Sequence, residues 1–179
     1  MNQNKFFLLA AIMLCIPFTV SAMDFTHKVD VDNMTFQWKV DGENLHVGLR
    51  AKTTSWVGIG FNPTDGMKDA NFILGYVKGG KVKITDHHGT TARQHDQDSK
   101  SGGQDNITNA AGKEDGGFTE ISFTIPLNSG DANDGVIVPD KENVVLLAYG
   151  PGRDSFKTRH AFKIALKINL ATGKFDKLK

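Results

Sequence analysis

Alternation of hydrophobic and polar residues dominates the chain and predicts β-strands. Apolar residues occupy every second position over residues 34–40 and 45–51, and the polar segment Asp41-Gly42-Glu43-Asn44 separates the two runs. A period of two buries one face of a strand, and a short glycine-containing segment between two such runs is typical of a hairpin. The pattern therefore predicts a hairpin over these residues.

Similar patterns predict further strands along the chain. Residues 57–61 are apolar on both faces, as in a central strand, and Gly58 and Gly60 there permit close approach by another group. The last apolar run, from His160, fits a helix moderately well, but five consecutive alternating positions favour a strand. The remaining predicted strands are residues 70–77, 81–87, 118–125 and 143–149.

Several strands with turn signals and no convincing long helix predict an antiparallel β-sandwich. We find no internal repeat and no linker, so one domain is expected. The polar segment 88–117 is predicted to be a long loop, a length that usually indicates function or mobility in a compact domain.

The first 22 residues are expected to be a cleaved export signal. Lys5 precedes an apolar stretch that ends at Val20, and Ser21-Ala22 then supplies small residues for a signal peptidase. The stretch is short for a membrane span of about 20 residues. We therefore expect a domain over residues 23–179, no membrane span after signal cleavage, and a periplasmic or secreted protein.

Composition excludes several classes of site. Cys15, the single cysteine, lies inside the expected signal, so the mature chain would have no disulfide, no thiolate metal site and no C-x-x-C-H haem attachment. Without Lys5, the 21 lysines and arginines become 20, which balance the 20 acidic residues. With no net charge and no basic stripe, nucleic acid and anionic membrane are poor candidate partners.

Two residues stand where packing alone does not explain them. Met67 lies in the polar loop 62–69, which is a poor core segment. His160 shares the strand parity of Phe162 and Ile164, so in a strand it would point toward the apolar face. A thioether and a neutral imidazole can ligate haem iron from both sides without any cysteine. The alternatives are a loosely packed loop methionine and a core histidine bonded to a backbone carbonyl.

Other polar motifs carry weaker signals. His87 and His88 would point to opposite faces of a strand, so they cannot easily share an ion. His88 with His95 and Asp96 offers a zinc or copper ligand set, although a solvated polar loop is the favoured interpretation. The segment from Asp96 begins like a calcium-binding loop, but Lys100 occupies its fifth position and the closing glutamate is missing. We find no nucleophile paired with a base, and therefore do not expect an enzyme.

Residues 56–76 resemble the core signature of the DOMON domain family. The segment contains the family's W-x-G-x-G-F strand, a loop methionine at Met67, a D-A-N step ending at Asn71, and the pair Gly75-Tyr76. The resemblance extends over nearly all of the mature chain. It implies an all-β fold, an immunoglobulin-like antiparallel β-sandwich of about ten or eleven strands.

The resemblance also implies a function. One branch of the family, which includes the cytochrome domain of cellobiose dehydrogenase, binds haem b between a loop methionine and a late histidine. Met67 and His160 match those two roles, which implies a b-type cytochrome that transfers single electrons to a transient redox partner protein. Because related subunits of molybdenum dehydrogenases use a lysine in place of the histidine, Lys157 and Lys163 remain alternative ligands.

Two other functions stay open at this stage. Some DOMON domains lack the ligand pair and are thought to bind a sugar or another small molecule. Here such a ligand would contact the segment 88–117 and the aromatic residues Trp38, Trp56 and Tyr76. The third candidate is an accessory subunit of a larger redox enzyme.

Overall fold

The structure, a computed structural model, describes residues 23–178, so the expected export signal lies outside the described residues. The strands in the described part are β1 (His27–Val31), β2 (Met34–Asp41), β3 (Asn44–Ala51), β4 (Val57–Phe61), β5 (Asn71–Lys78), β6 (Lys81–Thr91), β7 (Gln94–Gln97), β8 (Thr108–Asp115), β9 (Phe118–Pro126), β10 (Glu142–Tyr149), β11 (Phe162–Asn169) and β12 (Phe175–Lys177), with one short 3-10 helix, η1 (Asp98–Lys100).

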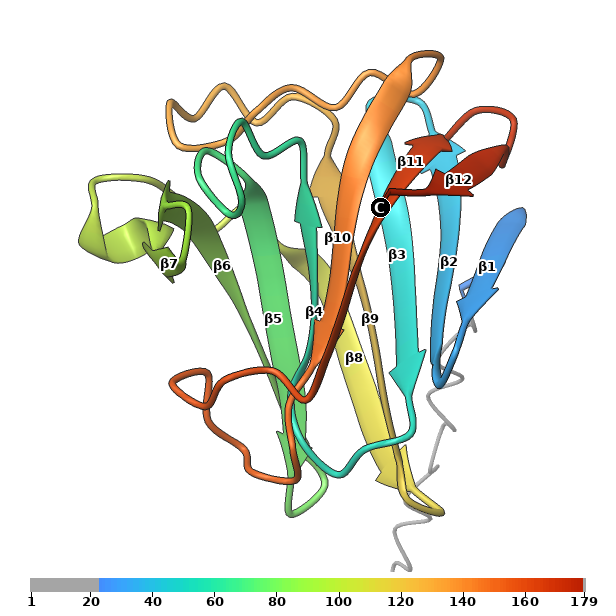
Figure 1. Ribbon diagram of the computed structural model, residues 1–179, viewed down its shortest axis with the longest axis vertical. Helices are drawn as coiled ribbons and strands as arrows, with labels where there is room; N and C mark the ends of the chain where they lie inside the picture. Colours follow the sequence, from blue (N-terminus) through green and yellow to red (C-terminus); the bar gives the residue numbers. More distant parts are fainter. Residues whose placement is uncertain (1–22, 179) are drawn as a thin grey trace, which may run out of the picture.

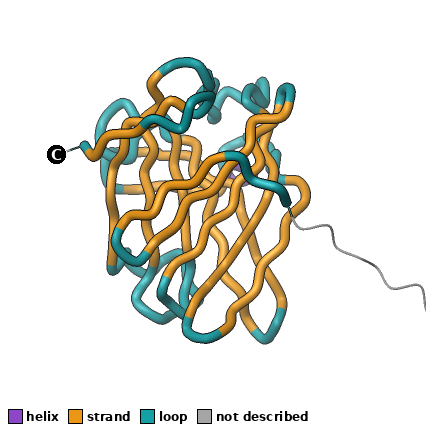
Figure 2. The backbone as a smooth tube through the Cα atoms, turned by 90° about the vertical axis from the view of Figure 1, so that its right-hand side faces the viewer, coloured by secondary structure: helices purple, strands orange, loops and turns teal. Residues whose placement is uncertain are grey.

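The strands form two sheets that pack face to face (Figure 1). The five-stranded sheet has the order β1-β2-β3-β9-β8, and the seven-stranded sheet has the order β12-β11-β10-β4-β5-β6-β7. All neighbouring strands are antiparallel. The loops gather at the two ends of the strands (Figure 2). The predicted fold, an all-β immunoglobulin-like antiparallel β-sandwich, is confirmed.

The main core lies between the sheets and is built from alternate strand residues. Phe36, Trp38 and Phe123 from the five-stranded sheet pack in the same cluster as Leu147 and Leu166 from the seven-stranded sheet. Trp38 is fully buried, and its indole Nε1–H donates a hydrogen bond of 2.8 Å to a backbone carbonyl near the chain's end. Strand parity thus places the aromatic residues of β2 and β9 in the core, as the sequence pattern predicts.

The predicted strands correspond closely to the observed ones. The hairpin over residues 34–51 is β2–β3, the runs after residue 70 are β5 and β6, and the last run is the strand β11 rather than a helix. The predicted central strand is β4, which pairs with β5 on one side and β10 on the other and has no exposed residue.

Two sequence predictions are wrong in detail. The segment 88–117 is not a single loop, because β6 extends to Thr91 and the segment also contains β7 and β8. Strands β7 and β8 each lie at a sheet edge and contain few apolar residues. Their sequences therefore show no hydrophobic alternation that would predict a strand. The strand β11 begins at Phe162, which leaves His160 in the preceding loop.

Within residues 23–178, the structure has no helix with the length and apolar character that crossing a membrane requires.

Candidate functional site

A second apolar cluster covers the outer face of the seven-stranded sheet, the face turned away from the five-stranded sheet. Along β5, Ile73 faces the main core whereas its neighbours Phe72 and Leu74 face outward. This outer cluster consists of Trp56, Met67, Ala70, Phe72, Leu74, Tyr76, Leu146, Ala148 and Phe156. A sheet that is apolar on both faces must be covered on both faces. Here the outer face is covered by loops from the two ends of the strands.

Two glycines of β4 lie beneath the outer cluster. A Cβ atom on Gly60 would overlap the Phe72 ring, and one on Gly58 would approach the Leu74 Cγ atom to 3.2 Å. The glycines therefore let both side chains rest directly on the sheet, and the predicted close approach by another group is confirmed.

Met67 lies in the loop between β4 and β5, and its half-buried side chain packs against the outer cluster. The β6–β7 hairpin holds its backbone. The Met67 N–H donates to the carbonyl of Ala92 over 3.1 Å, and the Met67 carbonyl occupies the space where a side chain on Gly89 would lie. The β6–β7 hairpin thus fixes the backbone of Met67, while its side chain packs against the apolar outer cluster.

His160 lies in the loop 150–161, which joins β10 to β11, and is half-buried. Burial, aided by the charge of Lys163, lowers the pKa of its imidazole, which favours the neutral ligand form. The parity argument for its direction does not apply, because His160 precedes β11, whose alternate residues from Phe162 onward face the inter-sheet core. The loop, not strand parity, sets where His160 points.

The two loops approach the outer cluster from opposite ends of the sheet. The loop 62–70 follows the end of β4, whereas the loop 150–161 follows the end of β10, which pairs beside the start of β4 (Figure 1). These ends are separated by the length of β4, about 15 Å for five residues. Phe156 brings the second loop onto the outer face, with its ring 5.1 Å from the Tyr76 ring and 5.8 Å from the His87 ring. Met67 and Phe156, which lies in the loop of His160, therefore pack against the same outer cluster.

The alternative lysine ligands are both exposed. Lys157 lies in the loop of His160, and Lys163 lies on β11.

A pair of histidines beside the outer cluster was not predicted. His87 of β6 and His95 of β7 approach each other with Nδ1 atoms 3.1 Å apart, and the His95 ring lies 5.6 Å from that of Phe72. Burial lowers the pKa of both, that of His87 to about 3, so both rings are neutral near pH 7. The sequence analysis grouped His95 with His88 instead, but the hairpin register puts His95 opposite Gly89 and therefore on the His87 face.

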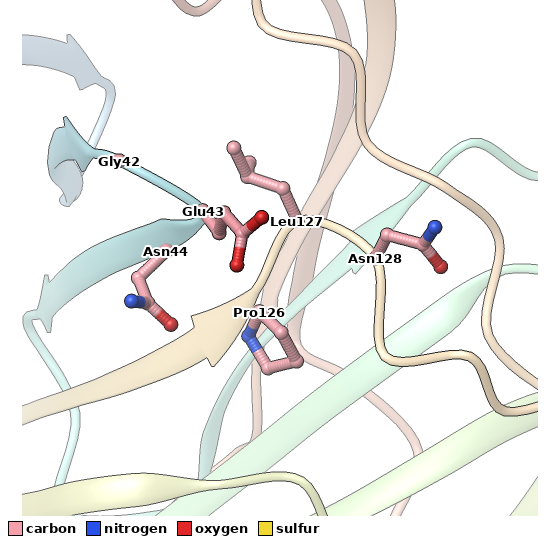
Figure 3. A pocket seen from close by; sticks show the side chains of 6 residues that line it. All are labelled: Gly42, Glu43, Asn44, Pro126, Leu127 and Asn128. Carbon is pink, nitrogen blue, oxygen red and sulfur yellow. The ribbon is translucent and has the colours of Figure 1, made fainter.

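The surface expected for a sugar is only partly present. Trp38 is buried in the main core and therefore cannot stack on a ligand, and Trp56 is 5% exposed. A hollow of about 350 Å³ lies elsewhere, between the β2–β3 turn and the end of β9 (Figure 3). Its lining includes Glu43 and Asn128 but no aromatic residue, so it lacks the stacking surface of a typical sugar site.

Two side chains from the loops that reach the outer cluster have the chemistry of haem ligands. Met67, which packs against the cluster, has a soft thioether, and His160, in the same loop as Phe156, has an imidazole that burial keeps neutral. The apolar side chains of the cluster suit the large apolar faces of a porphyrin. The Trp56 Nε1–H is buried without a hydrogen-bond partner in the described structure, so this face also has a free donor.

The chain is similar to known proteins in sequence and in structure. The chain is 30% identical to DBH-like monooxygenase protein 1 of Mus musculus over 113 residues, which are 62% of this chain but only 18% of that protein. The structure resembles the cytochrome b domain of pyranose dehydrogenase from Coprinopsis cinerea, with a TM-score of 0.58, 15% identity, and coverage of 77% of this chain and 78% of that one. The cytochrome domain of Myriococcum thermophilum cellobiose dehydrogenase gives a TM-score of 0.49 and 12% identity over 73% of this chain and 69% of that one. Residues 30–150 match the model of the DOMON domain, and the chain belongs to this family.

Proposed function

We propose that this protein is an exported b-type cytochrome domain that holds one noncovalent haem b through Met67 and His160 and transfers single electrons. The observation that carries the proposal is the place of Met67. Its thioether lies half-buried on an apolar outer face that the loop of His160 also covers. The similarity in fold to a cytochrome b domain supports the same function.

The two donor side chains define the chemistry. A bound haem would supply a one-electron ferric–ferrous couple. Met67 and His160 would hold the haem as its two protein ligands, and the group would then supply electron transfer rather than a site for a substrate or oxygen. Thioether ligation favours the ferrous form and raises the potential, while the neutral His160 ring binds without first losing a proton. The protein would therefore be an electron carrier rather than an enzyme.

Export and a transient partner complete the proposal. The apolar stretch before Ala22 has the features of a cleaved signal, which would deliver the domain to the periplasm or the medium. A redox partner protein would make a brief contact over a small surface near the outer cluster, because electron-transfer encounters bury little area.

The test is reconstitution with haem followed by absorption spectroscopy. The wild-type protein should give the split α and β bands of low-spin ferrous haem on reduction. Met67→Ala and His160→Ala should each lose these bands. Met23→Ala and His46→Ala are matched controls, since both residues are half-buried and lie on or near the five-stranded sheet, and they should retain the bands.

Several results would contradict the proposal. A wild-type protein that binds no haem, or one that is colourless and binds a glycan, would favour the small-molecule module instead. Bands that survive His160→Ala but disappear in His95→Ala or Lys157→Ala would move the second ligand to that residue and overturn the role of His160.

A further inference from the structure

Three aspartates from separate segments converge on the inner side of the seven-stranded sheet. Asp86 comes from β6, Asp98 from η1, and Asp134 from the connection between β9 and β10. One carboxylate oxygen from each lies within 4.8 Å of the other two. Asp86 is 4% exposed and Asp98 is fully buried. We refer to these three residues as the acidic cluster.

The chain itself neutralises the acidic cluster poorly. In the described part of the chain, the basic side chain that contacts it is His88, whose Nδ1 lies 2.9 Å from Asp98 Oδ1. The backbone N–H of Asn106 donates to Asp86 Oδ2 over 3.0 Å. By hydrogen-bond geometry, Asp86 Oδ1, Asp98 Oδ2 and both oxygens of Asp134 are buried there without a partner, although Ser129 and Asp98 lie close enough to Asp134 to influence its pKa. Buried carboxylates are normally paired or bound to a metal ion.

Burial also favours protonation of these groups. It raises the pKa of Asp86 to about 8 and that of Asp134 to about 6, and it raises the pKa of Asp98 as well. A cation at this position would take the place of these protons.

Asn71 provides an independent oxygen on the same side of the sheet. It is 5% exposed, and its side-chain Oδ1 is buried without a hydrogen-bond partner. Asn71 on β5 pairs directly with His88 on β6, so the two side chains project from the same face. His88 contacts Asp98 there, and Asp86, two residues earlier on β6, shares that face. The free amide oxygen therefore points to the side of the sheet that holds the acidic cluster.

We propose that Asp86, Asp98 and Asp134, with the amide oxygen of Asn71, form a calcium-binding site. The available donors are all oxygen atoms, which suit a hard cation. Calcium takes six to eight oxygen ligands in flexible geometry, whereas magnesium usually keeps several waters and binds through one or two carboxylates. Three carboxylates with oxygens within 4.8 Å of one another, and an amide oxygen on the same side of the sheet, therefore suit calcium better.

The site would tie three distant segments together. Asp98 follows the β6–β7 hairpin, and Asp134 lies in the long connection 127–141. A bound ion would therefore fix both segments to β6, and because it binds only the folded state, it would raise the melting temperature.

The experiment is thermal unfolding of the protein after removal of metals with EDTA and dialysis. Calcium chloride at a concentration far above its dissociation constant should raise Tm by about 5–10 °C, and titration calorimetry should give one site. Magnesium chloride should raise Tm by less than half as much. Asp98→Asn and Asp134→Asn should lose the response to calcium while remaining folded without it, because each removes a buried charge. Asp115→Asn, at an exposed aspartate that ends β8, is the matched control and should respond fully.

An unchanged wild-type Tm on addition of calcium would overturn the site. An undiminished calcium response in both Asp98→Asn and Asp134→Asn would do the same, because the ion would then bind elsewhere. An equal response to magnesium would overturn the choice of calcium.

Discussion

The outer cluster and the acidic cluster lie on opposite faces of the same strand, and burial affects their ionisable groups in opposite directions. On β6, Asp86 faces inward and His87 faces outward. Burial raises the pKa of Asp86 and lowers that of His87, so each group is driven toward its neutral form. The outer face therefore offers neutral imidazole and thioether donors, whereas the inner side offers carboxyl oxygens that a cation would bind by displacing their protons. One strand serves two kinds of ligand chemistry.

Truncating the outer cluster should have the largest effect on stability. Phe72 is 8% exposed and its ring rests on the Gly60 backbone, so Phe72→Ala would leave a cavity. We expect the free energy of unfolding to fall by about 3–5 kcal/mol, measured by urea denaturation. The control Val136→Ala, at a residue that is 53% exposed, should change it by less than about 0.5 kcal/mol. A cost below about 1 kcal/mol for Phe72→Ala would show that the outer cluster contributes little packing energy.

The acidic cluster should make the metal-free protein less stable as pH rises. The folded-state pKa of Asp86 is about 8, above its usual 3.8, so the native state binds more protons between these values. Stability is then fully present below about pH 4 and is lost, by several kcal/mol, as pH rises toward 8. In EDTA, Asp86→Asn should flatten this dependence and Asp115→Asn should preserve it. Equal slopes in wild type and Asp86→Asn would contradict the assignment.

The histidine pair should give a smaller dependence of the opposite sign. The folded-state pKa of His87 is about 3, below its usual 6.5, so the unfolded state binds more protons between these values. This contribution is present above pH 6.5 and is lost as pH falls, by about 1 kcal/mol between pH 6.5 and 5. Denaturation of His87→Gln, compared with His46→Gln, should show a weaker loss of stability over that range. If His87→Gln lost as much stability as the wild type between pH 6.5 and 5, the pH dependence would come from other groups.

Local patterns in the sequence predicted the strands that bury one or both faces. The alternation in β2 and β3 and the double-sided apolar run of β4 correspond directly to their burial in the sandwich. Edge strands were missed because β1, β7, β8 and β12 each have one unpaired side or little apolar content, so packing does not constrain their sequences in the same way.

The candidate sites were less predictable because they depend on long-range register. Met67 could be singled out by its polar neighbours, but the cluster against which it packs also includes Phe156, almost ninety residues later. The pairing of His95 with His87 follows from the β6–β7 register, which a single sequence does not reveal. In the sequence, Asp98 belongs to a segment that begins like a calcium-binding loop but lacks the closing glutamate. The cluster it joins includes Asp134 from a distant connection, for which no motif exists.

Gly89 shows how a residue without reactive atoms can determine the position of one that has them. Its amide N–H donates to the Ala70 carbonyl and its own carbonyl accepts from Asp69, while the Met67 carbonyl fills the space of a missing side chain. Any other residue there would push the methionine loop off the hairpin. Among homologues, this position would tolerate substitution as poorly as a ligand does. Invariance at Gly89 would thus reflect the space that its backbone leaves for the methionine loop rather than any reactive atom. A ranking of residues by conservation alone would then count Gly89 among the ligands.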